Sequence, residues 1–72
     1  MVEATTVEIE LNGRKRAVRE GETVAELVLE LGLRPGMVAV EVNERLVARE
    51  RRESTSLRAG DKVELVTIMG GG

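Results

Sequence analysis

The sequence predicts an α+β domain in which one main helix covers one face of a mixed sheet of about five short strands. Two segments, 6–11 and 62–66, alternate apolar and polar residues with the period of a half-buried strand. A third segment, 23–31, carries its apolar residues at helical spacing. Asn, Gly and Asp residues stand at turn positions between such segments, so each element is expected to be short.

The length of 72 residues is that of one small domain. With 11 Val, 8 Leu and 2 Ile, and no Phe, Tyr or Trp, its core must be aliphatic. We therefore expect a single domain over residues 1–72. Residues 1–5 are expected to be an extension, and residues 70–72 a flexible glycine tail.

The first strand is expected at 6–11, because Val7, Ile9 and Leu11 would share its core-facing side. Asn12-Gly13 follows at once and predicts a tight hairpin turn, since both residues tolerate positive φ. The returning strand, 14–19, is polar, which favours the edge of a sheet. Its best inward residue is Val18.

The helix is expected to begin at Thr23. Thr23 and Glu26 have the spacing of a capping box, in which each side chain binds the other residue's backbone N–H. Gly32 is in the position that favours a left-handed residue after a helix. The pattern predicts about nine helical residues, with an apolar stripe made of Val24, Leu27, Val28 and Leu31.

The second half continues with a loop at 33–36 and a strand at 37–42. Asn43-Glu44 is expected to turn into a short strand at 45–47. Residues 48–56 have no clear period and predict an irregular surface segment with a short 3₁₀ turn.

Leu57 is expected to anchor that irregular segment to the core. A tight turn at 59–61 then leads to the last strand, 62–66.

The missing residue types exclude several kinds of site. Without Cys or His the chain has no thiolate nucleophile, no imidazole base and no ordinary zinc or haem ligands. Without aromatic residues it has no platform on which bases could stack, and its net charge of −2 does not favour nucleic acid. No apolar run is long enough to span a membrane. We therefore expect a cytoplasmic protein that is not itself an enzyme.

Gly70, Gly71 and Gly72 stand together at the C-terminal end of the sequence. Glycine has no Cβ, so such a tail is thin enough to enter a narrow channel of another protein. There it could present its terminal carboxylate for activation as an acyl-adenylate. The alternative is a frayed or engineered tail without a role.

The order of motifs resembles the sulfur carriers of thiamine biosynthesis, a family with the ubiquitin-like β-grasp fold. The motifs are, in order, Asn12-Gly13, Thr23–Leu27, Leu31–Leu33, Val38–Asn43, Val47–Arg49, Leu57–Val66 with Gly60-Asp61, and Gly71-Gly72. Two positions depart from the family pattern, because Ala48 stands where Pro is frequent and Glu44 where a turn Gly is common. These departures affect only the assignment of the pathway.

The resemblance implies that Gly72 carries the reactive group and that Gly70 and Gly71 thread into the partner. A ubiquitin-activating-type adenylyltransferase (ThiF-like) would activate the carboxylate with ATP and magnesium, and the chain itself would bind no cofactor. Sulfur from a donor such as a cysteine desulfurase would then form a thiocarboxylate. A thiazole synthase (ThiG-like) would accept that sulfur during formation of the thiamine thiazole ring.

Val66, Ile68 and Met69 precede the glycines and are predicted to dock partners from the open face of the sheet. The alternative is that Ile68 only packs at the end of the sheet. Five arginines in the second half have two interpretations; they are Arg45, Arg49, Arg51, Arg52 and Arg58. We expect a solvated face with local ion pairs to Glu50 and Glu53, the alternative being a basic surface that steers an acidic partner.

Related functions stay open at this stage. A carrier of this class could serve molybdopterin synthesis, tRNA thiolation or cysteine synthesis. Molybdopterin carriers commonly have prolines before the glycines, and residues 66–69 contain none. A ubiquitin-like modifier joined through Gly72 to a lysine, or an interaction module with an idle tail, would also fit.

Overall fold

The structure is a computed structural model that describes residues 5–68. The predictions for Met69, Gly70, Gly71 and Gly72, and most of the expected N-terminal extension, lie outside the described residues. The elements, in which η denotes a 3₁₀ helix, are β1 Thr6–Leu11, β2 Arg14–Arg19, α1 Val24–Glu30, η1 Pro35–Met37, β3 Val38–Val42, β4 Arg45–Leu46, η2 Arg49–Ser54 and β5 Lys62–Thr67.

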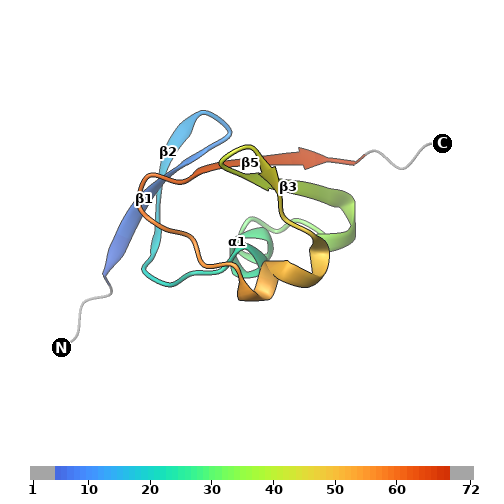
Figure 1. Cartoon of the computed structure of the whole chain (residues 1–72), viewed down its shortest axis with the longest axis horizontal. Helices are drawn as coiled ribbons and strands as arrows, with labels where there is room; N and C mark the ends of the chain where they lie inside the picture. Colours follow the sequence, from blue (N-terminus) through green and yellow to red (C-terminus); the bar gives the residue numbers. More distant parts are fainter. Residues whose placement is uncertain (1–4, 69–72) are drawn as a thin grey trace.

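The five strands form one mixed sheet in the order β2-β1-β5-β3-β4. β1 and β5 are parallel, and the other neighbouring pairs are antiparallel. α1 lies on one face of this sheet, and η2 lies beside α1 on the same side (Figure 1). The predicted α+β architecture is therefore confirmed.

The core lies between α1 and the sheet and is wholly aliphatic. The central strands contribute every second residue to the core, because successive side chains of a strand point to opposite faces of the sheet. Its buried members are Ile9, Val18, Val24, Leu27, Val28, Val38, Val40, Leu57 and Val63. The expected anchoring of the irregular segment by Leu57 is thus confirmed.

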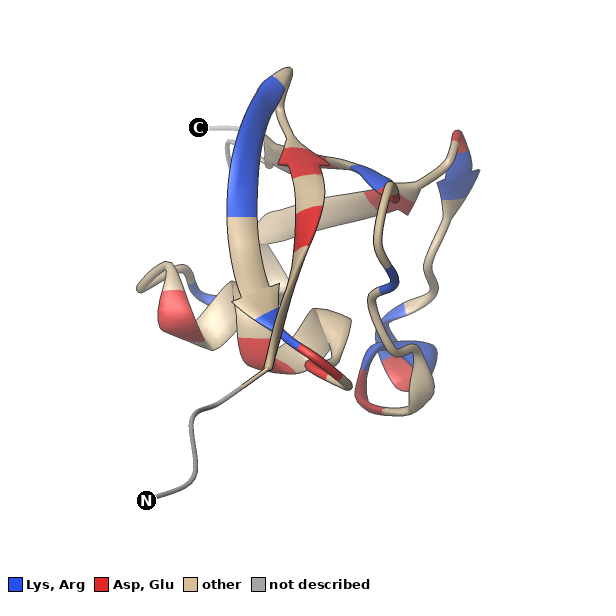
Figure 2. Cartoon of the chain, turned by 90° about the vertical axis from the view of Figure 1, so that its left-hand side faces the viewer, with Lys and Arg blue, Asp and Glu red and all other residues tan. Residues whose placement is uncertain are grey.

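The first hairpin forms as predicted. Asn12 and Gly13 have φ values of 48° and 83°, and Leu11 pairs with Arg14. β2 lies at the sheet edge and is rich in basic residues, next to the acidic residues of β1 (Figure 2). The Lys15 ammonium lies 3.9 Å from the Glu8 carboxylate across these two strands.

The capping box at the start of α1 is also confirmed. The Glu26 N–H donates to Thr23 Oγ1 at 3.1 Å, and the Thr23 N–H donates to Glu26 Oε1 at 2.9 Å. That bond from the Thr23 backbone, and then the Thr23 hydroxyl, hold the pKa of Glu26 below its ordinary value. The capping box is therefore strongest when Glu26 is ionised.

α1 has seven residues rather than the expected nine. The N–H groups of Gly32 and Leu33 donate to Leu29 O and Val28 O, and these bonds close the helix at Glu30. Gly32 adopts a φ of 73°, the left-handed conformation predicted for it.

The segment before β3 differs from the prediction. Met37 was expected in the strand but belongs to η1, because its N–H donates to Arg34 O and closes a 3₁₀ turn. Pro35 favours that turn through its fixed φ. The 3₁₀ turn expected within 48–56 is present as η2, and β5 extends one residue further than predicted, to Thr67.

Candidate functional site

β5 presents different residues to the two faces of the sheet. Val63 is buried and Leu65 is half-buried on the side of α1. Glu64 and Val66 therefore lie on the opposite face, which we call the open face. Val66 has 59% of its surface exposed, so its predicted exposure on this face is confirmed.

Two neighbouring strands extend the apolar surface around Val66. Ala39 of β3 is its direct partner across the strands. Glu41, two residues along β3, pairs with Glu64 on one side and with Leu46 of β4 on the other. Leu46 is 69% exposed and was not singled out in the sequence, although strand alternation on both sides of Asn43-Glu44 could have placed it on this face.

Ile68 follows the end of β5. Its N–H donates to Met37 O at 2.6 Å, so its backbone is anchored at the end of the sheet. Its side chain is nevertheless 49% exposed. Both Val66 and Ile68 are therefore accessible, while docking of partners by them stays a prediction.

The end of β5 extends beyond β1. Beyond the end of β1, Asn12 makes the hydrogen bonds to β5 that a longer β1 would make. Its N–H donates to Val63 O, and its side-chain Oδ1 accepts from Leu65 N–H at 2.8 Å. After Leu65, within the described part of the chain, β5 is paired only with β3. The last described residues of the chain thus run along β3 alone toward the glycines.

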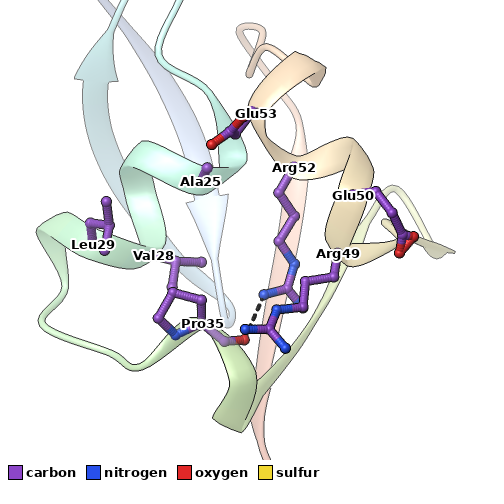
Figure 3. Close-up of a pocket in the computed structure, with 8 residues that line it drawn as sticks. All are labelled: Ala25, Val28, Leu29, Pro35, Arg49, Glu50, Arg52 and Glu53. Carbon is purple, nitrogen blue, oxygen red and sulfur yellow. Dashed lines mark hydrogen bonds between the residues drawn. The ribbon is translucent and has the colours of Figure 1, made fainter.

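The expected solvated arginine face is wrong for Arg52. Its side chain is 6% exposed, and its two terminal nitrogens donate to Val38 O and to Pro35 O, the second bond being visible in Figure 3. The expected pairs to Glu50 and Glu53 are absent as well, because the ion pairs among residues 5–68 are Lys15–Glu8 and Arg16–Glu30. η2 turns Arg52 inward, a direction that an irregular segment without periodicity could not reveal.

A groove of about 360 Å³ lies between α1, η1 and η2, on the helix side of the sheet. Its walls combine apolar surface with the Arg52 guanidinium, and the Arg49 guanidinium lies beside that of Arg52 (Figure 3). Its lining residues are Ala25, Val28, Leu29, Pro35, Arg49, Glu50, Arg52 and Glu53. This groove was not predicted from the sequence, and it lies across the sheet from Val66.

Residues 5–68 contain no group of three or more His, Cys, Asp or Glu side chains placed to hold a metal ion. Among the helices of the same residues, none has the length and apolar character needed to cross a membrane.

Comparison with known proteins identifies the family. The sequence profile of the ThiS family matches residues 4–72. The chain belongs to the ThiS family. The sulfur carrier protein ThiS of Thermus thermophilus is 40% identical over 62 residues, which are 86% of this chain and 95% of that protein. The resemblance to the sulfur carriers of thiamine biosynthesis is thereby confirmed.

A solved ThiS structure supports the fold. The crystal structure of the thiamine biosynthesis protein ThiS from Geobacter metallireducens superposes with a TM-score of 0.79 and 33% identity. The match covers 92% of this chain and all of that one. The mixed sheet with one main helix is therefore the ubiquitin-like β-grasp of ThiS proteins, as predicted.

A longer protein also contains a ThiS-like segment. A thiazole synthase of Magnetococcus marinus is 36% identical over 66 residues, which are 92% of this chain. The chain spans 20% of the length of that relative. A ThiS-like sequence thus occurs within a protein named for the thiazole-forming step.

Proposed function

We propose that this chain is a sulfur carrier of thiamine biosynthesis, a co-substrate on which other enzymes act. The observation that carries the proposal is its membership of the ThiS family over residues 4–72, a span that includes all three glycines. The similarity to T. thermophilus ThiS over 95% of that protein supports the same conclusion. The absence of Cys and His from the sequence agrees with chemistry carried by a terminus rather than by a side chain.

The proposed chemistry begins at the carboxylate of Gly72. One carboxylate oxygen bonds to the α-phosphorus of ATP in the activating enzyme, and pyrophosphate leaves with its magnesium ion. The terminal sulfur of a persulfide then attacks the acyl carbon of the adenylate, and AMP leaves. Cleavage of the resulting acyl disulfide by a thiol releases the thiocarboxylate and oxidises that thiol to a disulfide.

What this chain itself contributes to these steps is the narrow cross-section of its glycine residues. Gly70 and Gly71 offer no Cβ to the walls of a narrow channel, so the carboxylate of Gly72 can reach a buried ATP. A ThiF-like adenylyltransferase would supply that channel, and a cysteine desulfurase would supply the sulfur. The ThiS-like segment of the M. marinus thiazole synthase supports a ThiG-like enzyme as the sulfur acceptor.

We propose that partners dock on the open face. Val66 and Leu46 expose apolar side chains there, Ile68 exposes one after the end of β5, and Met69 is the next residue in the sequence. Glu41 and Glu64 lie directly opposite each other on β3 and β5, an arrangement of like charges that destabilises an isolated sheet. We therefore propose that the partner surface is apolar, with basic side chains that approach these two carboxylates.

The test is reconstitution followed by intact-mass measurement. The full chain is incubated with the adenylyltransferase of its own host, ATP, magnesium and a persulfide donor. We expect a species heavier by the exchange of one oxygen for one sulfur atom, localised to the C-terminal peptide. A matched control carries one additional alanine after Gly72 and should stay unmodified.

Two outcomes would contradict the proposal. The first is an unmodified chain in a reaction whose enzyme is active on a reference carrier. The second is a chain recovered as a lysine conjugate, which would identify a protein modifier instead.

A further inference from the structure

We propose that Arg52 is a positioning residue for the C-terminal segment. Its guanidinium holds the stretch of backbone to which Ile68, the last described residue before the tail, is anchored. This inference rests on the proposed function, because it concerns how the reactive end of the carrier is aimed at the activating enzyme.

The first observation is the pair of bonds that Arg52 makes. Nη1 donates to Pro35 O at 2.8 Å and Nη2 donates to Val38 O at 2.7 Å. Figure 3 shows the side chain reaching from η2 to the Pro35 carbonyl. Pro35 is the first residue of η1 and Val38 directly follows its last, so one rigid planar group fixes both ends of that turn.

The second observation is the position of Val38 O on the sheet. Carbonyl groups two residues apart on a strand point to the same side, and Val40 O accepts the Val47 N–H on the side away from β5. Val38 O therefore points to that side too. The pairing of β4 with β3 is limited to Glu41 and Val42, so no β4 residue reaches Val38. Arg52 supplies the donor that a longer β4 would have supplied.

The third observation connects this backbone to the tail. Met37 lies between the two carbonyls that Arg52 holds, and Met37 O accepts the Ile68 N–H at 2.6 Å. Val38 is also the cross-strand partner of Thr67. A shift of η1 would therefore move the acceptor of the last described backbone hydrogen bond before the glycines.

Stability alone is a weak reason for an arginine at this position. The Arg52 side chain is buried, no described carboxylate lies within 4.0 Å of its guanidinium, and its Nε has no partner. A buried charge loses its hydration, and this cost offsets part of what the two hydrogen bonds contribute to stability. What an apolar residue cannot do is hold Pro35 O and Val38 O at a fixed separation.

The consequence for activation follows from geometry. The carboxylate must meet the α-phosphorus of ATP in line, and small errors of placement slow such reactions strongly. Docking by Val66 on the open face does not involve Arg52. Loss of Arg52 should therefore lower kcat for adenylation and leave KM for the carrier nearly unchanged.

The experiment compares three variants of the full chain, namely Arg52→Met, Arg52→Lys and the control Arg51→Met. Arg51 belongs to the same 3₁₀ helix but is exposed. Pyrophosphate release by the host's adenylyltransferase gives kcat and KM, and native-state amide hydrogen exchange reports the Ile68 N–H. For Arg52→Met we expect kcat to fall about tenfold or more, KM to change less than about threefold, and Ile68 exchange to accelerate about tenfold.

The outcomes separate the two proposals. Equal kcat and equal Ile68 exchange in Arg52→Met and Arg51→Met would overturn the positioning role, even if Arg52→Met melts earlier. If Arg52→Met does not fold, Arg52→Lys tests the proposal instead. Lysine keeps the positive charge but lacks the planar group that donates to Pro35 O and Val38 O together. Wild-type values for Arg52→Lys would then overturn the proposal. If the wild-type chain is not adenylated, the proposed function fails, while Ile68 exchange in the variants still decides whether Arg52 holds this backbone.

Discussion

The two faces of the sheet are built from the same strands but differ in almost every physical respect. On the side of α1, Ile9, Val40 and Val63 are fully enclosed by aliphatic neighbours. On the open face, Val66 and Leu46 are exposed beside the opposed carboxylates of Glu41 and Glu64. The open face therefore has features that folding alone does not require. The comparison teaches that alternate residues of one strand serve the core on one face and leave accessible apolar and charged groups on the other.

This division predicts two separate classes of variant. Changes in the core and at the cap of α1 should lower the free energy of unfolding and leave activation intact below the melting temperature, whereas Arg52, on the same side, is proposed to affect activation. Changes around Val66 on the open face, or in the tail, should impair activation and leave stability intact.

The largest expected effect is on the helix side. Leu27→Ala should lower the free energy of unfolding by about 2–5 kcal/mol, because Leu27 is fully buried and its removal leaves a cavity. Urea denaturation measures this change. Leu29→Ala, on the same helix but at an exposed position, is the matched control and should change stability by less than about 0.5 kcal/mol. Equal losses in both variants would contradict the assignment of the core.

The next largest effect is expected in the tail. Gly71→Trp should reduce adenylation about 100-fold or more, since a bulky side chain cannot follow the glycines into a narrow channel and the carboxylate is displaced. Pyrophosphate release measures the rate, and urea denaturation should show unchanged stability. Normal adenylation of Gly71→Trp would rule out threading.

A smaller effect is expected on the open face. Val66→Glu should raise KM for the carrier about tenfold, because it places a third carboxylate beside Glu41 and Glu64 and removes apolar contact. Ala17→Glu introduces the same group on the same face but at the far edge strand, β2. Docking at Val66 is disproved if both variants, or neither, change KM.

The cap of α1 offers a test on the helix side. Thr23→Ala should lower the free energy of unfolding by about 1 kcal/mol, because Glu26 N–H loses its side-chain acceptor. Thr23→Ser keeps that acceptor and should stay close to the wild type. Activation kinetics should be unchanged in both variants, and a lower kcat in Thr23→Ala would weaken the division between the two faces.

The smallest effect is a pH dependence at the same cap. The pKa of Glu26 in the folded chain lies below its ordinary value of 4.5, so folding favours the ionised form. Its contribution to stability is fully present above pH 4.5 and is lost as the pH falls through the lower folded pKa. Urea denaturation of the wild type and Glu26→Gln across this range should show a difference in free energy that shrinks with acidity. A constant difference would exclude ionised Glu26 as the cause.

Much of the local structure was predictable from short stretches of sequence. The Asn12-Gly13 turn, the Thr23–Glu26 capping box and the left-handed Gly32 depend on neighbouring residues, and all three are confirmed. Alternation also placed Val66 on the open face correctly. These features were readable because their causes are steric preferences and hydrogen bonds that act within a few residues.

The errors that concern the candidate site lie where distant segments meet, while those in α1 and at Met37 are shifts of element ends by one or two residues. Arg52 was expected in solvent because its neighbours are polar, but its acceptors, Pro35 O and Val38 O, lie 17 and 14 residues away. Leu46 became notable only once β4 was paired with β3. The two contacts of Arg52 leave no periodic signal in the sequence, whereas alternation around Asn43-Glu44 could have placed Leu46.

The sequence by itself determined the fold class, the aliphatic core, the main turns and the glycine motif that indicates a carrier. Only the tertiary structure decided that β1 and β5 run in parallel, that Val66 stands beside Ala39, and that Arg52 supports the backbone that anchors Ile68. The physical reason is the range of the interactions. Local preferences are fixed by adjacent residues, whereas pairing and burial depend on which distant backbone groups need a partner once the sheet has formed.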